Sequence, residues 1–139
     1  LCDRRQRQMC IRDRYAIADT NEVQSVTTAA AGECDVLYIP TDNTLASVTE
    51  TVYNVVAPAK IPVIAGEEGI CNGCGVATLS ISYYDLGYAT GEMAYEILAE
   101  GADITTMDVR YAPNVTKKYN AKICEELGIT VPDDYVAIQ

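Results

Sequence analysis

Histidine, phenylalanine and tryptophan are absent from this chain of 139 residues, and its ten aromatic side chains are all tyrosines. Without histidine, the chain has no Ser-His-Asp or Cys-His nucleophile system and no metal site that uses an imidazole ligand. An enzyme made from it would have to work with carboxylates, cysteine, lysine or tyrosine. The glycines Gly69, Gly73 and Gly75 match neither GxGxxG nor GxxxxGK[ST], so we expect no phosphate cradle and no cofactor.

Positive charge is also scarce, because ten Lys and Arg residues face twenty Asp and Glu residues and the net charge is −10. Half of the basic residues lie within residues 1–14, so the remainder of the chain is strongly acidic. Nucleic acids and anionic membranes repel such a body, and we expect no nucleic-acid partner. No apolar run approaches the ~18 residues of a membrane-spanning helix.

The basic leader, residues 1–14, differs in charge from everything that follows it. Read back through the codon table, Met9–Asp13 gives ATG TGT ATA AGA GAC. With the flanking bases AG, this resembles the end sequence of a transposon that is used to prepare sequencing libraries. We therefore predict that residues 1–14 are a non-native leader. The alternative is a genuine basic arm.

From Tyr15 onward, strand-like and helix-like segments alternate, which is typical of βαβ units and predicts an α/β fold with a parallel sheet flanked by helices. A hydrophobic content of 49% is enough for a packed core in one domain. Buried strands are predicted at residues 35–40, 61–66, 76–82 and 109–112, after the tail of a strand at 15–19. Helices are predicted up to Gly32 and over 45–58, 83–100 and 116–127, with a Gly-rich loop at 67–75.

Two polar loops directly follow predicted buried strands, namely Thr41–Thr44 and Gly66–Gly69. Ligands of parallel α/β sheets bind beyond the carboxyl ends of the strands, so these loops are the best candidates for a binding site. Asp42 and Asn43 are both helix-capping residues, and one of them is expected to cap the next helix. The other, with Thr41, can then face a ligand, where a carboxylate would pair with an ammonium group.

Glu67 and Glu68 are adjacent carboxylates with three open interpretations: recognition of an amino group, plain solvated charge, or a general acid/base pair. Because sequence neighbours point in different directions, both are not expected to contact one ligand atom.

Four segments carry a resemblance to a known family: DVLYIPTDNTLAS, AKIPVIAGEEG, ATLSISYYDLGYATGEMAYEIL and YNAKICEELGITVP. In order and spacing they resemble the carboxyl-terminal part of ABC-transporter substrate-binding proteins related to tryptophan- and tyrosine-type amino-acid binders. The resemblance implies a type I periplasmic-binding-protein fold, in which two lobes joined by three hinge strands close on a ligand. Residues 15–139 would then be an incomplete carboxyl-terminal portion, with residues 83–108 packing on the absent amino-terminal lobe.

The resemblance also implies a function. It implies a secreted, usually lipid-anchored protein that binds an amino acid or a similar zwitterion, delivers it to an ABC permease and catalyses no reaction. Tyr83, Tyr84 and Asp85 lie where the family chain crosses back to the other lobe, and Tyr84 and Asp85 are candidate ligand contacts; the alternative is an ordinary helix start. Two other functions remain open: a ligand-sensing domain of a regulator and a carboxylate-based enzyme.

Cys71 and Cys74 form a CxxC pair within the predicted loop. A zinc site needs four ligands, and Cys34 and Cys124 would have to converge on the pair by chance. We therefore expect no metal site. The open alternatives are a local disulfide, which an extracellular protein permits, and two free thiols.

Overall fold

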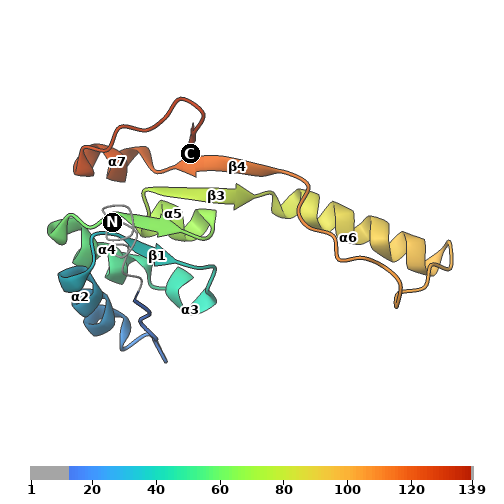
Figure 1. Ribbon diagram of the computed structural model, residues 1–139, viewed down its shortest axis with the longest axis horizontal. Coiled ribbons are helices and arrows are strands. Elements are labelled where there is room, and N and C mark those ends of the chain that lie inside the picture. The colour runs from blue at the N-terminus through green and yellow to red at the C-terminus, as the bar shows by residue number, and fades with distance from the viewer. Residues whose placement is uncertain (1–12, 139) are drawn as a thin grey trace, which may run out of the picture.

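The computed structural model describes residues 13–138, which form a five-stranded sheet with helices packed on it and one helix that projects away (Figure 1). The predicted leader therefore falls outside the described residues, except for residues 13 and 14. The elements are, in order, α2 (Val23–Glu33), β1 (Leu37–Ile39), α3 (Asn43–Ala46), α4 (Thr49–Ala59), β2 (Val63–Ala65), α5 (Glu68–Cys74), β3 (Ala77–Ile81), α6 (Tyr83–Leu98), β4 (Val115–Tyr119), α7 (Ala121–Leu127) and β5 (Val136–Ala137).

The sheet has the strand order β1-β2-β3-β4-β5 and is mostly parallel. Strands β1, β2 and β3 are parallel neighbours, β4 runs antiparallel to β3, and β5 is parallel to β4. The predicted α/β fold with a parallel sheet flanked by helices is confirmed, and β4 and β5 run opposite to the first three strands. After β3 the chain runs out along α6 and returns to the same edge of the sheet, so β4 enters in the opposite direction (Figure 1).

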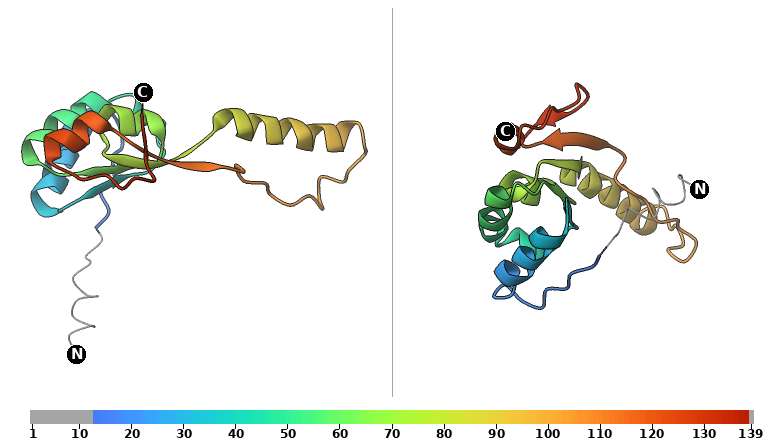
Figure 2. Two further views of the ribbon diagram at one scale, coloured as in Figure 1. Left: turned by 90° about the horizontal axis from the view of Figure 1, so that it is seen from above. Right: turned by 60° about the vertical axis from the view of Figure 1, so that its left-hand side comes forward.

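One face of the sheet carries the core. Successive side chains of a strand point to opposite faces, so Ile39, Val63 and Ala65 are buried while Tyr38 and Ile64, their neighbours in the chain, are exposed. Helices α4 and α5 cover the buried face, and Figure 2 shows the helices gathered on that side of the sheet. The buried cluster consists of Val23, Ile39, Val52, Val56, Val63, Ala65, Ile70, Cys71 and Cys74.

Two further predictions near the carboxyl terminus are wrong. Residues 109–112 form no strand, because they have no neighbouring strand in the described part of the chain, and Tyr111 is 84% exposed. The helix predicted from Thr116 begins only at Ala121, because residues 115–119 pair with β3. Asn120 then caps α7, with its side-chain oxygen accepting from the backbone N–H of Ile123 at 3.2 Å.

Smaller differences occur in the first half of the chain. The single helix predicted over 45–58 is divided into α3 and α4, because Val48 between them has a non-helical backbone. Residues 15–19 belong to no strand of the sheet, and the Tyr15 hydroxyl instead donates to Glu33 Oε2 at 2.7 Å.

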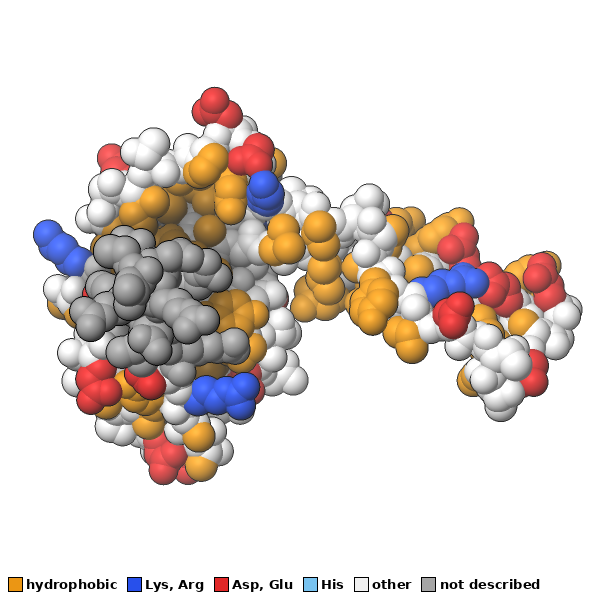
Figure 3. Space-filling model, viewed as in Figure 1, with side chains coloured by type: hydrophobic (Ala, Val, Ile, Leu, Met, Phe, Trp, Pro, Cys, Tyr) orange, Lys and Arg blue, Asp and Glu red, His pale blue; other side chains and the backbone are white. Residues whose placement is uncertain are grey.

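Helix α6 stands off the sheet, and none of its sixteen residues is buried. Residues 99–114, the return segment, lead from the end of α6 back to β4. Figure 3 shows hydrophobic side chains along the projecting helix and this segment. The apolar side chains Leu86, Met93, Ile97 and Leu98 of this helix are half-buried or exposed. Arg110 of the return segment holds α6 through both oxygens of Glu96, at 2.6 and 2.8 Å.

The ends of β1 and β2 lie in close contact at Gly66. Its N–H donates to the carbonyl of Ile39 at 2.7 Å, and the Thr41 hydroxyl donates to its carbonyl at 3.2 Å. A Cβ atom at Gly66 would lie 2.6 Å from the backbone nitrogen of Thr41 and 2.9 Å from the carbonyl carbon of Pro40. These neighbours are backbone atoms, so only glycine fits without displacing the loop.

This contact gives the first prediction. Gly66→Ala should lower the free energy of unfolding of this chain by about 1–3 kcal/mol, because the added methyl group overpacks a backbone contact. Gly32→Ala is the matched control: a Cβ atom there meets nothing within 4 Å, and alanine in helix α2 should stabilise by about 0.5–1 kcal/mol. Urea unfolding of both variants measures the two effects. An unchanged midpoint for Gly66→Ala would contradict the close contact.

Candidate functional site

The carboxyl ends of β1, β2 and β3 lie side by side, because these three strands are parallel neighbours. The polar loops after β1 and β2 therefore meet at one edge of the sheet, where ligands of such sheets bind. The Thr41–Gly66 hydrogen bond joins these loops directly. The structure thus brings together the first two groups of predicted site residues, 41–43 and 67–68.

Asp42 is a helix cap. Its backbone is extended and its Oδ1 accepts from the N–H of Leu45 at 2.9 Å, which closes the amino-terminal end of α3. The prediction that one residue of the Asp42–Asn43 pair is a cap is confirmed. Asn43, the first residue of α3, is exposed, and within residues 13–138 its amide has no hydrogen-bond partner.

Glu67 is also a helix cap. Its carboxylate accepts from the N–H groups of Gly69, at 2.7 Å, and Ile70. The predicted loop at 67–75 is therefore wrong, since Glu68–Cys74 form α5 with Ile70, Cys71 and Cys74 buried on one face. Gly73 allows α5 to pack closely on α4, because a Cβ atom at this position would lie 2.2 Å from Thr49 Oγ1 of α4.

Glu68 points to the covered face of the sheet. Its Oε2 accepts from Ser80 Oγ at 3.0 Å and from Lys118 Nζ at 2.7 Å. The Lys118 ammonium holds the pKa of this carboxyl below its usual range, although partial burial acts the other way. A general acid needs a raised pKa, and Glu67 is engaged with backbone N–H groups. The geometry therefore does not favour an acid/base pair.

Tyr84 and Asp85 lie at the amino-terminal end of α6, next to the end of β3. Tyr84 is 80% exposed, and Ser82 caps the helix by accepting from the N–H of Asp85 at 3.1 Å. Asn114 of the return segment donates to Asp85 Oδ2 at 3.3 Å. Within residues 13–138, the hydrogen bonds of Asp85 go to Ser82 and Asn114, and none links Tyr84 or Asp85 to residues 41–43 or 67–68.

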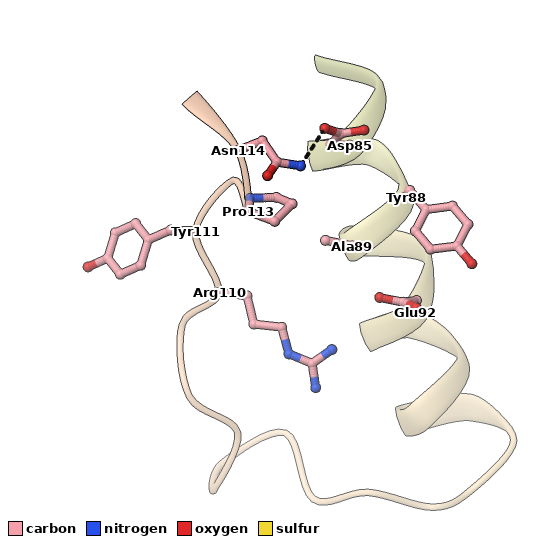
Figure 4. A pocket seen from close by; sticks show the side chains of 8 residues that line it. All are labelled: Asp85, Tyr88, Ala89, Glu92, Arg110, Tyr111, Pro113 and Asn114. Carbon is pink, nitrogen blue, oxygen red and sulfur yellow. Dashed lines mark hydrogen bonds between the residues drawn. The ribbon is translucent and has the colours of Figure 1, made fainter. Parts of the chain in front are cut away.

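An open groove of about 430 Å³ lies between α6 and its return segment. In Figure 4, the Tyr88 and Tyr111 rings point away from the space between the two segments, and Asn114 points toward Asp85. This groove could not be predicted from the sequence, because its two walls come from segments that are joined by the Arg110–Glu96 ion pair. Its lining residues are Asp85, Tyr88, Ala89, Glu92, Arg110, Tyr111, Pro113 and Asn114.

The sequence profile of the ABC transporter substrate binding protein family matches residues 11–138, nearly the whole chain. This chain belongs to that family. The family resemblance inferred from the sequence is thus confirmed.

Relatives of this substrate-binding protein chain are known from clostridia and streptococci. A tyrosine-binding protein of Clostridioides difficile (strain R20291) is 40% identical over 97 residues, which are 66% of this chain and 28% of the relative. A ligand-free, open substrate-binding protein with adhesive properties from Clostridium difficile is 37% identical, with a TM-score of 0.68 over 88% of this chain and 43% of that one. An ABC domain from Streptococcus pneumoniae in complex with L-Trp is 30% identical, with a TM-score of 0.78 over 91% and 45%. The chain thus spans less than half the length of these relatives.

The CxxC pair of this family member lies on α5. Cys71 and Cys74 are free thiols in the structure, which corresponds to the second of the two alternatives, and both are buried. Among the described residues, no three His, Cys, Asp or Glu side chains are placed to hold a metal ion. In the same part of the chain, no helix is long and apolar enough to cross a membrane.

Burial gives a second prediction. It raises the pKa of the Cys71 and Cys74 thiols to about 12, so almost no thiolate, the reactive form, is present at pH 8. Among the cysteines of residues 13–138, iodoacetamide should modify the half-buried Cys34 first in the native chain, and Cys71 and Cys74 only after urea is added. Peptide mass spectrometry measures the order of labelling. Rapid labelling of Cys71 in the folded chain would contradict this burial.

Proposed function

We propose that this chain supplies one side of the ligand site in a solute-binding protein of an ABC importer, which binds an amino acid between two lobes and delivers it to a membrane permease. The observation that carries the proposal is the meeting of the Thr41–Asn43 and Gly66–Glu67 loops at the carboxyl edge of the sheet, in a chain of this family. The rest of the site would come from the part of the protein that lies outside this chain.

The chemistry of the edge suits an ammonium group. Asp42 uses one carboxylate oxygen for the cap, and a carboxylate has lone pairs left for a second donor. Thr41 and Asn43 add a hydroxyl and an amide, and Glu67 keeps acceptor capacity beside its capped N–H groups. Acceptors therefore outnumber cations at this edge, so the ligand carboxylate would be held from the opposite lobe.

The relatives support an aromatic amino acid as the ligand, since one is named a tyrosine-binding protein and another was solved with L-Trp. Tyr84, exposed at the start of α6, offers a ring for stacking, and Asp85 offers a second carboxylate. We propose that residues 83–108 pack on the other lobe, so that Tyr84 and Asp85 approach the ligand from that side.

Transport would follow from lobe closure. The closed, loaded form would dock on the permease, a hinge motion of a common type. Importers of this class receive solute from outside the cytoplasm, and we propose that the whole protein is extracytoplasmic and held to the membrane by a lipid anchor. No observation favours the regulator or the enzyme over this function.

The third prediction tests whether the loops at the carboxyl edge of the sheet contact the ligand. In the full-length protein, Asn43→Ala should weaken binding of L-tyrosine or L-tryptophan by about tenfold, because one hydrogen bond to a charged ligand group is lost. Asn54→Ala, on an exposed position of α4, is the matched control and should leave the affinity unchanged. Titration calorimetry measures both. If no amino acid binds the unaltered protein, the proposed function is wrong.

The fourth prediction concerns this chain alone. Residues 13–138 hold only the acceptor-rich side of the proposed site, so the isolated chain should bind the same amino acid at least ~100-fold more weakly than the full-length protein. Calorimetry on the two proteins, in the same buffer, makes the comparison. Micromolar binding by the isolated chain would show that the second lobe is not needed.

A further inference from the structure

Three polar side chains meet between α5 and the sheet, where a helix–sheet interface is ordinarily apolar. Ser80 comes from β3, Lys118 from β4 and Glu68 from α5, and both other side chains donate to Glu68 Oε2, at 3.0 and 2.7 Å. The Glu68 and Lys118 side chains are 38% and 28% exposed, so water reaches this cluster only in part.

Lys118 is directed to this cluster by the alternation of β4. Its neighbour Lys117 points to the opposite face and pairs with Asp134. In the register of the sheet, Lys118 lies opposite the buried Thr78 of β3, two residues before Ser80. The two adjacent lysines thus have different partners, and only Lys118 links β4 to a helix.

Helix α6 and the return segment together, residues 83–114, form an arm that projects from the sheet, and the cluster lies where this arm joins the sheet. β3 leads into α6 and β4 returns from it, and these two strands are its connection to the sheet (Figure 1). Ser80 is one residue before the end of β3, and Ser82 caps α6. Any rotation of the arm must therefore bend the chain next to Ser80 and within the strand that carries Lys118.

Glu68 also adjoins the ligand edge. It is the first residue of α5, directly after Glu67, whose carboxylate caps this helix. One carboxylate therefore ties the strands that carry the arm to the helix whose amino-terminal end forms part of the edge. Its negative charge is already matched by Lys118, which makes it a poor partner for a ligand ammonium.

We propose that Glu68, Ser80 and Lys118 form a positioning cluster that fixes the angle between the α6 arm and the ligand-binding edge, so that Glu68 sets ligand affinity through lobe closure rather than through ligand contact. This inference rests on the proposed function for its effect on affinity. The mechanical part, which concerns the stiffness of the arm's base, does not depend on a ligand.

The fifth prediction uses Glu68→Gln, Ser80→Ala and Lys118→Met in the full-length protein. Without ligand, hydrogen exchange of the peptides at the base of the arm, residues 80–85 and 114–119, should become faster on the order of tenfold in each variant, because local opening loses a charge-assisted contact. The Glu68→Gln/Lys118→Met double variant should be no faster than either single variant, since both break one interaction. Lys117→Met, the adjacent lysine on the other face, is the matched control and should leave residues 80–85 unchanged.

Stopped-flow binding of L-tyrosine distinguishes positioning from contact. If Glu68 acts by positioning, each variant should change two quantities together: the rate of lobe closure at saturating ligand, and the rate of hydrogen exchange at the base of the arm without ligand. Faster dissociation with unchanged exchange would show that Glu68 contacts the ligand, and unchanged exchange in all three variants would equally overturn the cluster. Ser80→Ala removes a single hydrogen bond and keeps the test valid if Lys118→Met does not fold. If the unaltered protein binds no amino acid, the proposed function fails while the exchange data still decide the mechanical part.

Discussion

The backbones of β1 and β2 approach each other at Gly66 until no side chain fits between them, and the geometry of the candidate site depends on that contact. Because a Cβ at Gly66 would lie 2.6 Å from the backbone nitrogen of Thr41, glycine is needed for the ends of β1 and β2 to approach this closely. The Thr41 hydroxyl then reaches the Gly66 carbonyl. The loops that begin α3 and α5 consequently start side by side.

The polar residues that cap helices after the strands use part of their hydrogen-bonding capacity to stabilise those helices, and only the remainder can serve a ligand. Asp42, Glu67, Ser82 and Asn120 all accept from backbone N–H groups of the helix that follows. The preference for such residues at strand ends is thus explained by capping alone. What distinguishes the edge as a candidate site is the hydrogen-bonding capacity that remains: the lone pairs of Thr41 and of the capping carboxylates, and the Asn43 amide, which has no hydrogen-bond partner within residues 13–138.

The sequence predicted the elements whose stability is local or comes from a buried apolar run. β1, β2 and β3 were found because their strands are short apolar runs, and α2 and α6 because of their helical spacing. α5 was not predicted because closely spaced glycines are typical of a loop, whereas here Gly73 allows α5 to pack closely against Thr49 of α4. β4 was missed because its side chains are mostly exposed and its conformation depends on pairing with β3. The pairing of Glu68 with Lys118 could not be predicted from the sequence, since the two residues lie 50 positions apart.

Helix α6 has apolar side chains on two opposite faces. Tyr84, Tyr88 and Tyr95 lie along one side at helical spacing, and Leu86, Met93 and Ile97 lie along the other. A helix that is apolar on both sides is ordinarily covered on both sides, and exposed stripes of this length are typical of interaction surfaces. The return segment contacts α6 through polar pairs, Arg110 to Glu96 and Asn114 to Asp85, and leaves the tyrosine side of the helix exposed. If the second lobe covers these side chains, as proposed above, it would transmit its motion to the base of the helix, where Glu68 joins β3, β4 and α5.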